Sequence, residues 1–135
     1  MDRIIAISDT VNAGIHSLVL AEMNGGNVSA RQVAERLGVS PTYLAKIMQK
    51  LAARGLLVPS RGLGGGYTLV RSATEISCLD VLDALEGGLP KRECLFTRSV
   101  CRTQTCALRA FCEETDTRLR RVLAATTIAA VARSF

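Results

Sequence analysis

This 135-residue chain has no long apolar run. Its apolar stretches are all much shorter than the ~18 or more consecutive apolar residues of a membrane-spanning helix. The first residues also lack the charged and then apolar pattern of a signal peptide. We therefore expect a cytoplasmic protein without a membrane partner, in a compartment where lasting disulfide bonds are rare. The composition is 48% hydrophobic, with no internal repeat and no low-complexity segment, which predicts one globular domain with an appendage.

Sequence signatures of enzymes are also absent. The glycine-rich residues 59–66 are not followed by Gly-Lys-Ser/Thr, which a phosphate-binding loop of a nucleotide-binding enzyme requires. The chain contains no Cys-x-x-Cys pair, which argues against a thiol oxidoreductase and disfavours an ordinary zinc ribbon or finger. No enzyme is therefore predicted.

The chain is basic, with a formal net charge of +5. Its positive residues are three lysines and fourteen arginines. The planar guanidinium group of arginine suits bidentate recognition of phosphates and guanine edges, so nucleic acid is a candidate partner. Basicity alone is weak evidence for binding to nucleic acid. The order of the predicted helices and strands is the stronger test of that hypothesis.

Two short helices joined by a tight turn are predicted in the first half, after a first helix that ends near residues 24–26. Ser29 and Gln32 form a capping box, and Gly38 can end the helix that follows. Ser40 then caps the next helix, which has proline at its first position. The outer face of this helix carries Thr42, Tyr43, Lys46, Gln49 and Lys50. This pattern predicts a helix-turn-helix whose second helix enters a major groove.

A small β hairpin is predicted next, with strands at residues 56–58 and 67–70. The loop between them contains Arg61 and Gly62 and is rich in glycine, so its backbone can approach a groove floor closely. A plain hairpin loop is the alternative. Beside a helix-turn-helix, the hairpin is interpreted as a two-stranded wing, which makes the fold a mainly α winged helix-turn-helix.

The second half begins with a helix capped by Ser77, followed by a long helix of roughly twenty residues that starts near Leu108. One face of the long helix is apolar and the other is charged, so it needs a partner surface. We predict a homodimer formed through this helix. A short terminal helix follows Thr126 and Thr127. The expected division is a DNA-binding domain at 1–90, a cysteine-rich loop at 91–106, and a dimerisation helix with a short terminal helix at 107–135.

Four of the five cysteines lie between residues 94 and 112, separated by six, four and five residues. Such loose spacing of soft thiolate ligands favours an iron-sulfur cluster over a single zinc ion. Cys112 falls on the apolar stripe of the long helix and is assigned to packing, as is Cys78 after its helix cap. The predicted ligands are Cys94, Cys101 and Cys106. Unligated or redox-paired cysteines are the alternative.

A fourth ligand would be needed for a three-cysteine site. The single histidine, His16, is the candidate because it lies on the polar face of the first helix, together with Asn12. A lone histidine is more often an ordinary hydrogen-bonded residue.

Several segments together resemble the Rrf-two family of bacterial winged-helix transcriptional regulators, which has cluster-binding members of the IscR, NsrR and RirA type as well as cluster-free members. The segments that carry the resemblance are residues 32–40, 43–47, 55–58, 61–67 and 76–81. The resemblance implies a dimer crossed through the C-terminal helices, with each cysteine loop near the first helix of the other chain.

The resemblance also implies roles for individual residues. Cys94, Cys101 and Cys106 stand where three cysteines hold a 2Fe-2S or 4Fe-4S cluster, with slightly different spacing and the same total span. His16 matches a histidine ligand of a 2Fe-2S redox-sensing member, whereas Asn12 replaces its acidic ligand, and Asp9 is a weaker acidic candidate.

The DNA-binding residues follow the same resemblance, with Ser40, Thr42 and Tyr43 at the start of the recognition helix and Arg61 at the start of the wing. Ala45 replaces a glutamate of the cluster-assembly regulator, so the operator preference of that regulator does not transfer. Phosphate contacts are assigned to Lys46, Lys50 and Arg54.

The predicted function is a dimeric DNA-binding repressor that senses redox state, nitric oxide or iron through an iron-sulfur cluster and binds a pseudo-palindromic operator. One alternative is a cluster-free thiol sensor of the same family. Another, of a different class, is an iron-sulfur carrier or partner-binding module without DNA affinity.

Overall fold

The helix-turn-helix of the sequence is present in the computed structural model, which describes residues 7–62, 65–96, 100–101 and 105–135. The Ser29 hydroxyl accepts the Gln32 N–H at 3.1 Å, and Gln32 Oε1 accepts the Ser29 N–H at 2.9 Å, as a capping box requires. Gly38 ends the helix in the left-handed conformation, with φ 68°. The elements are α1 (Asp9–Met23), β1 (Asn27–Val28), α2 (Ala30–Leu37) and α3 (Pro41–Ala53).

The wing belongs to a three-stranded antiparallel sheet with the order β1-β3-β2, in which β2 is Leu57–Ser60 and β3 is Gly66–Leu69. The additional strand, β1, was not predicted because two residues are too short to show an alternating pattern. Pro59 lies within β2, although the sequence places it in the loop. A proline is tolerated there because β2 is an edge strand, where its missing N–H breaks no ladder.

The second half consists of helices whose caps the sequence also identifies. The Ser77 hydroxyl accepts the Asp80 N–H at 3.1 Å, and the Thr127 hydroxyl accepts the Ala130 N–H at 3.1 Å. The long helix has 17 residues instead of the roughly twenty expected. The elements are η1 (Ala73–Glu75), α4 (Cys78–Glu86), α5 (Arg109–Ala125) and α6 (Ile128–Ala132).

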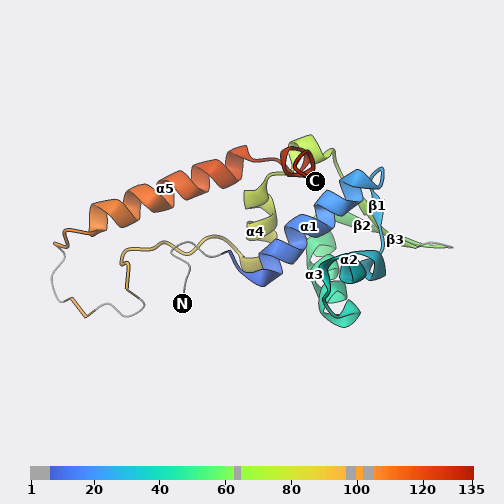
Figure 1. Cartoon of the computed structure of the whole chain (residues 1–135), viewed down its shortest axis with the longest axis horizontal. Coiled ribbons are helices and arrows are strands. Elements are labelled where there is room, and N and C mark those ends of the chain that lie inside the picture. The colour runs from blue at the N-terminus through green and yellow to red at the C-terminus, as the bar shows by residue number, and fades with distance from the viewer. Residues whose placement is uncertain (1–6, 63–64, 97–99, 102–104) are drawn as a thin grey trace.

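The core lies between α1, α3, α4, α6 and the sheet, and α5 projects from this body on the side opposite the wing (Figure 1). Fully buried side chains include Leu18, Leu44, Met48, Ile76 and Ile128. Backbone hydrogen bonds from Cys78 to Thr126 and from Ile128 to Ile76, at 2.9 and 2.8 Å, fasten the end of α5 to the body. None of the helices in the described ranges has the length and apolar character to cross a bilayer.

Candidate functional site

The exposed face of α3 displays the side chains that the sequence assigns to DNA. Leu44, Ile47, Met48 and Leu51 hold the opposite face in the core. The Ser40 hydroxyl accepts the Tyr43 N–H at 3.1 Å and so fixes the start of the helix. The assigned side chains are all exposed and recur at helical spacing: Thr42, Tyr43, Lys46 and Lys50. Hydroxyl, phenol and ammonium groups therefore face solvent along one side of α3.

The wing places Arg61 and Gly62 directly after β2, and both are exposed. The Ser60 hydroxyl accepts N–H groups from Gly66, at 3.2 Å, and from the Asn27 side chain, at 3.1 Å. These bonds close the base of the hairpin and tie it to β1. Arg61 therefore leaves the sheet from a fixed point, although residues 63–64 of the loop lie outside the described residues.

A contact that the sequence did not predict joins the recognition helix to α1. The Tyr43 Oη and Thr10 Oγ1 atoms share a hydrogen bond of 3.3 Å. The two residues are 33 positions apart, so no local pattern could have paired them. The Tyr43 side chain is therefore partly exposed to solvent, and its hydroxyl group is hydrogen-bonded to the first turn of α1.

The three predicted cluster ligands lie in and beside the segment before α5. Cys94 is half-buried, whereas Cys101 and Cys106 are exposed, and all are free thiols. Cys106 Sγ accepts the Leu108 N–H at 3.4 Å, at the start of α5. Within the described residues, which omit 97–99 and 102–104 of this segment, no three His, Cys, Asp or Glu side chains gather closely enough for a metal ion.

His16 makes its contacts inside the body of the same chain. Its Nδ1 atom lies 2.8 Å from the Asn12 carbonyl oxygen, one helical turn earlier. Its ring packs edge-on against Phe135, with 5.4 Å between ring centroids. Asp9, the weaker candidate, is the exposed first residue of α1. Among the described residues, His16 does not gather with two other possible ligands into a metal site.

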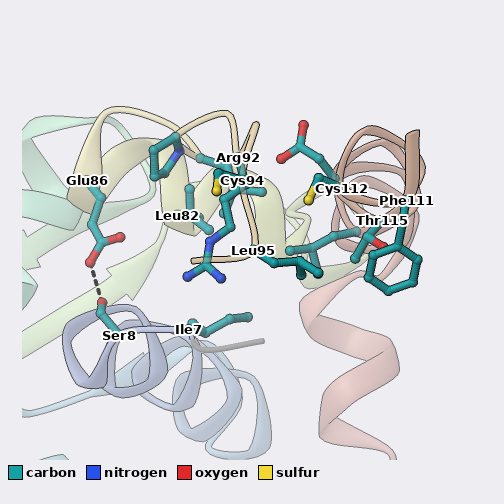
Figure 2. A pocket seen from close by; sticks show the side chains of 14 residues that line it. Ile7, Ser8, Leu82, Glu86, Arg92, Cys94, Leu95, Phe111, Cys112 and Thr115 are labelled. Carbon is teal, nitrogen blue, oxygen red and sulfur yellow. Dashed lines mark hydrogen bonds between the residues drawn. The ribbon is translucent and has the colours of Figure 1, made fainter. Parts of the chain in front are cut away.

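A partly open cavity of about 320 Å³ lies between α4, α5 and the segment that follows α4 (Figure 2). Cys94 and Cys112 both line it, and Ile7 and Ser8 close it from the start of α1. Ser8 donates a hydrogen bond to the Glu86 carboxylate at the end of α4. The cavity thus joins the cysteine segment to the first helix, which the sequence did not predict.

The remaining cysteines are buried, as their apolar positions predict. Cys112 is 5% exposed on α5, and Cys78 is 5% exposed at the start of α4. Burial raises the pKa of the Cys78 thiol by desolvation, so this group stays protonated and is a poor nucleophile.

Comparisons with known proteins agree with this geometry. The family model described as "Rrf2: Iron-dependent Transcriptional regulator" matches residues 7–134. A curated relative, the HTH-type transcriptional regulator IscR of Pectobacterium carotovorum, is 32% identical over 89 residues, which cover 66% of this chain and 51% of the relative. The chain thus spans about half the length of the curated relatives that it matches.

Two solved structures share the fold. CymR, the global cysteine regulator of B. subtilis, is 24% identical with a TM-score of 0.81, covering 97% of this chain and 98% of its own. IscR of T. potens is also 24% identical, with a TM-score of 0.73, covering 96% and 88%. At this level of identity the likeness establishes the winged-helix architecture.

Proposed function

Because the chain belongs to the Rrf2 family of iron-dependent transcriptional regulators, the Rrf-two family of the sequence resemblance, we propose that it is a dimeric DNA-binding repressor. The observation that carries the proposal is the exposed face of α3 beside the wing, which presents hydroxyl, phenol and cationic groups together. Charged and hydroxyl groups on a helix that protrudes beside a wing suit a major groove and its flanking phosphates.

The residues divide into two kinds of contact. Thr42 and Tyr43 lie in the first turn of α3, where recognition helices reach base edges. Lys46 and Lys50 lie farther along the same face and neutralise phosphates, with Arg54 at the end of the helix. The wing residues Arg61 and Gly62 contact the neighbouring minor groove.

For sensing, we propose that Cys94, Cys101 and Cys106 hold an iron-sulfur cluster. The three thiols are free, and soft thiolates are the donors that such clusters use. A bound cluster would supply a centre that oxidants, nitric oxide or iron shortage can damage. Two of the thiols are exposed, and the described residues include no group of three possible ligands, so ligation would bring the three cysteines together.

The chain itself provides a route from this segment to the DNA-binding surface. Cys94 shares its cavity with Ile7 and Ser8, and Ser8 caps α1 by accepting the Val11 N–H at 3.2 Å. Thr10, two residues later, is hydrogen-bonded to Tyr43. A shift of the cysteine segment would therefore move the start of α1 and change the population of α3 orientations that fit DNA.

The second candidate is a cluster-free thiol sensor with the same DNA-binding surface. The observation that favours it is the pair of free thiols, Cys94 and Cys112, in one cavity. The fold that this chain shares with a cysteine regulator is compatible with a thiol sensor, because one fold can carry either a thiol sensor or a cluster sensor.

DNA binding is tested by titrating the reduced protein against a duplex from its own promoter at several salt concentrations. We expect the logarithm of the affinity to fall linearly with the logarithm of the salt concentration, because binding releases counterions from phosphates. Absence of salt-sensitive binding in both the iron-loaded and the iron-free protein would contradict a DNA-binding function and favour a carrier or partner-binding module.

Cluster binding is tested by measuring iron and sulfide per monomer, with a visible spectrum, on anaerobically purified protein. Serine variants of Cys94, Cys101 and Cys106 should each lose iron, because each removes one thiolate donor. Cys78→Ser is the matched control and should retain iron, since Cys78 is buried in α4. A wild-type protein without iron, sulfide or a visible band would favour the thiol sensor.

A further inference from the structure

We propose that Cys94 and Cys112 are a reversible dithiol pair, which peroxide converts into an intrachain disulfide across the cavity between α4 and α5. The inference concerns the iron-free protein, because Cys94 cannot hold a cluster and form a disulfide at the same time. It deepens the second candidate function, the thiol sensor, and rests on the proposed DNA-binding function for its effect on operator affinity. Both sulfurs belong to the lining of the same cavity, with Cys94 on the segment after α4 and Cys112 on α5 (Figure 2).

Two polar contacts align the segment of Cys94 along α5. Arg120 donates a hydrogen bond to the Leu89 carbonyl, and Arg109 forms an ion pair of 3.5 Å with Glu93. Arg109 and Arg120 lie on either side of Cys112 along α5. Eleven helical residues span about 16 Å, and the four steps from Leu89 to Glu93 reach about 13 Å when extended. The segment therefore runs along the part of α5 that contains Cys112.

Cys94 and Cys112 are the two cysteines that line this cavity, which makes them better placed to form a disulfide than the other described thiols. Cys112 is 5% exposed and opens on the cavity, and Cys94 is half-buried there. Cys101 and Cys106 are exposed and do not line the cavity. Burial in α4 raises the pKa of Cys78, which makes it a poor partner. A cavity of about 320 Å³ admits a small oxidant.

The reaction uses peroxide as the two-electron oxidant. The Cys94 thiolate attacks one peroxide oxygen, the O–O bond breaks, and the products are Cys94 sulfenic acid and hydroxide, which takes up the thiol proton to become water. The Cys112 sulfur then attacks the Cys94 sulfur, the S–O bond breaks, and the hydroxyl group leaves as water with the Cys112 proton. Two thiols and one peroxide thus give one disulfide and two waters, and a small thiol reverses the bond by exchange.

Closing this bond would pull the segment of Cys94 onto α5 and reshape a cavity whose wall includes Ile7 and Ser8. Because Thr10 is hydrogen-bonded to Tyr43, a shift of α1 would also move the start of the recognition helix. We expect oxidation to weaken operator binding by about 5- to 150-fold, the range of typical allosteric coupling.

The disulfide is tested directly on the full iron-free chain. The reduced protein is treated with one equivalent of hydrogen peroxide, alkylated, and digested without reductant for mass spectrometry. An arginine lies between each neighbouring pair of these cysteines, so trypsin separates them into peptides that carry Cys94, Cys101, Cys106 and Cys112. The expected main product joins the peptides of Cys94 and Cys112. A main product that joins any other pair, or no intrachain disulfide, overturns the inference.

Variants then separate the pair from the DNA-binding function. Cys112→Ala and Cys94→Ser should each abolish the disulfide and the peroxide-dependent loss of operator affinity, whereas Cys78→Ser should retain both. The wild-type digest decides the pairing even if the Cys112 variant does not fold. If the reduced wild type binds the operator but forms no Cys94–Cys112 bond, this inference fails and the proposed function stands. If the bond forms without any operator binding in the reduced state, the proposed function fails instead.

Discussion

At the residue scale, the close approach of β1 to the wing depends on one missing side chain. A Cβ atom at Gly66 would lie 2.5 Å from the Val28 carbonyl oxygen and 3.0 Å from Ser29 Cα. Both neighbours are backbone atoms, so neither can yield by changing a rotamer. Gly66 therefore lets β1 pair with β3, and β1 leads directly into the Ser29 cap of α2.

Gly66→Ala should lower the free energy of unfolding by about 1–3 kcal/mol, the usual cost of forcing an extra methyl group into a packed site. Urea unfolding followed by circular dichroism measures this. Gly14→Ala is the comparison, because its Cβ would meet the Leu85 Cδ1 atom, which is the end of a side chain. We expect a smaller loss for Gly14→Ala, further offset by alanine's preference for helices. If Gly66→Ala were as stable as the wild type, β1 would be able to move away from residue 66 of β3 without a cost in stability.

At the element scale, α3 divides its residues between the core and the proposed DNA contact. The buried face is continuous from Leu44 to Leu51, and the lysines occupy the face turned away from it. Since both lysines are exposed, their replacement should change DNA binding with little change in stability.

Lys46→Ala and Lys50→Ala should each weaken binding to all duplexes by a similar factor and reduce the salt slope by about 1, since each removes one phosphate contact. Thr42→Ala should instead relax the preference for the operator over unrelated DNA. Lys91→Ala is the matched control, because Lys91 is exposed and belongs to the segment after α4, outside α3 and the wing. Fluorescence anisotropy at several salt concentrations measures the slopes. An unchanged slope for both α3 variants would remove these lysines from the contact.

At the scale of the whole molecule, α5 leaves an apolar stripe on the outside of the chain. Phe111 is 52% exposed and Val122 is 51% exposed, and Leu108 continues the stripe toward the start of the helix. These side chains recur at helical spacing on a helix that projects from the body (Figure 1). A second copy of α5 is the proposed cover for this stripe, and a dimer would present two recognition helices to two operator half-sites.

Val122→Glu should raise the dimer dissociation constant by about tenfold or more, because a carboxylate without a partner would have to leave water and enter an apolar interface. Thr117→Glu adds the same charge on the exposed opposite face and should leave the dimer intact. Sedimentation velocity across a dilution series measures both. A monomeric wild type, or equal dissociation of the two variants, would contradict a dimer through α5.

Local signals predicted the elements well. The caps at Ser29, Ser40 and Ser77 are all formed, because each cap needs only a hydroxyl and an N–H group three residues away. The winged helix-turn-helix architecture is confirmed as well. The boundaries of the wing shifted by one or two residues, since Pro59 is acceptable in an edge strand and the sequence does not say which strand is at the edge.

The sequence by itself determined the helix-turn-helix, the wing, the family and the identity of the residues proposed to contact DNA and iron, because these depend on residue type and short spacing. Only the tertiary structure decided which distant residues meet. It added β1 to the sheet, joined Tyr43 to Thr10, and brought Cys112 into the cavity of Cys94. The physical reason is that such contacts arise from the packing of whole helices, which leaves no periodic trace in the segments that they connect.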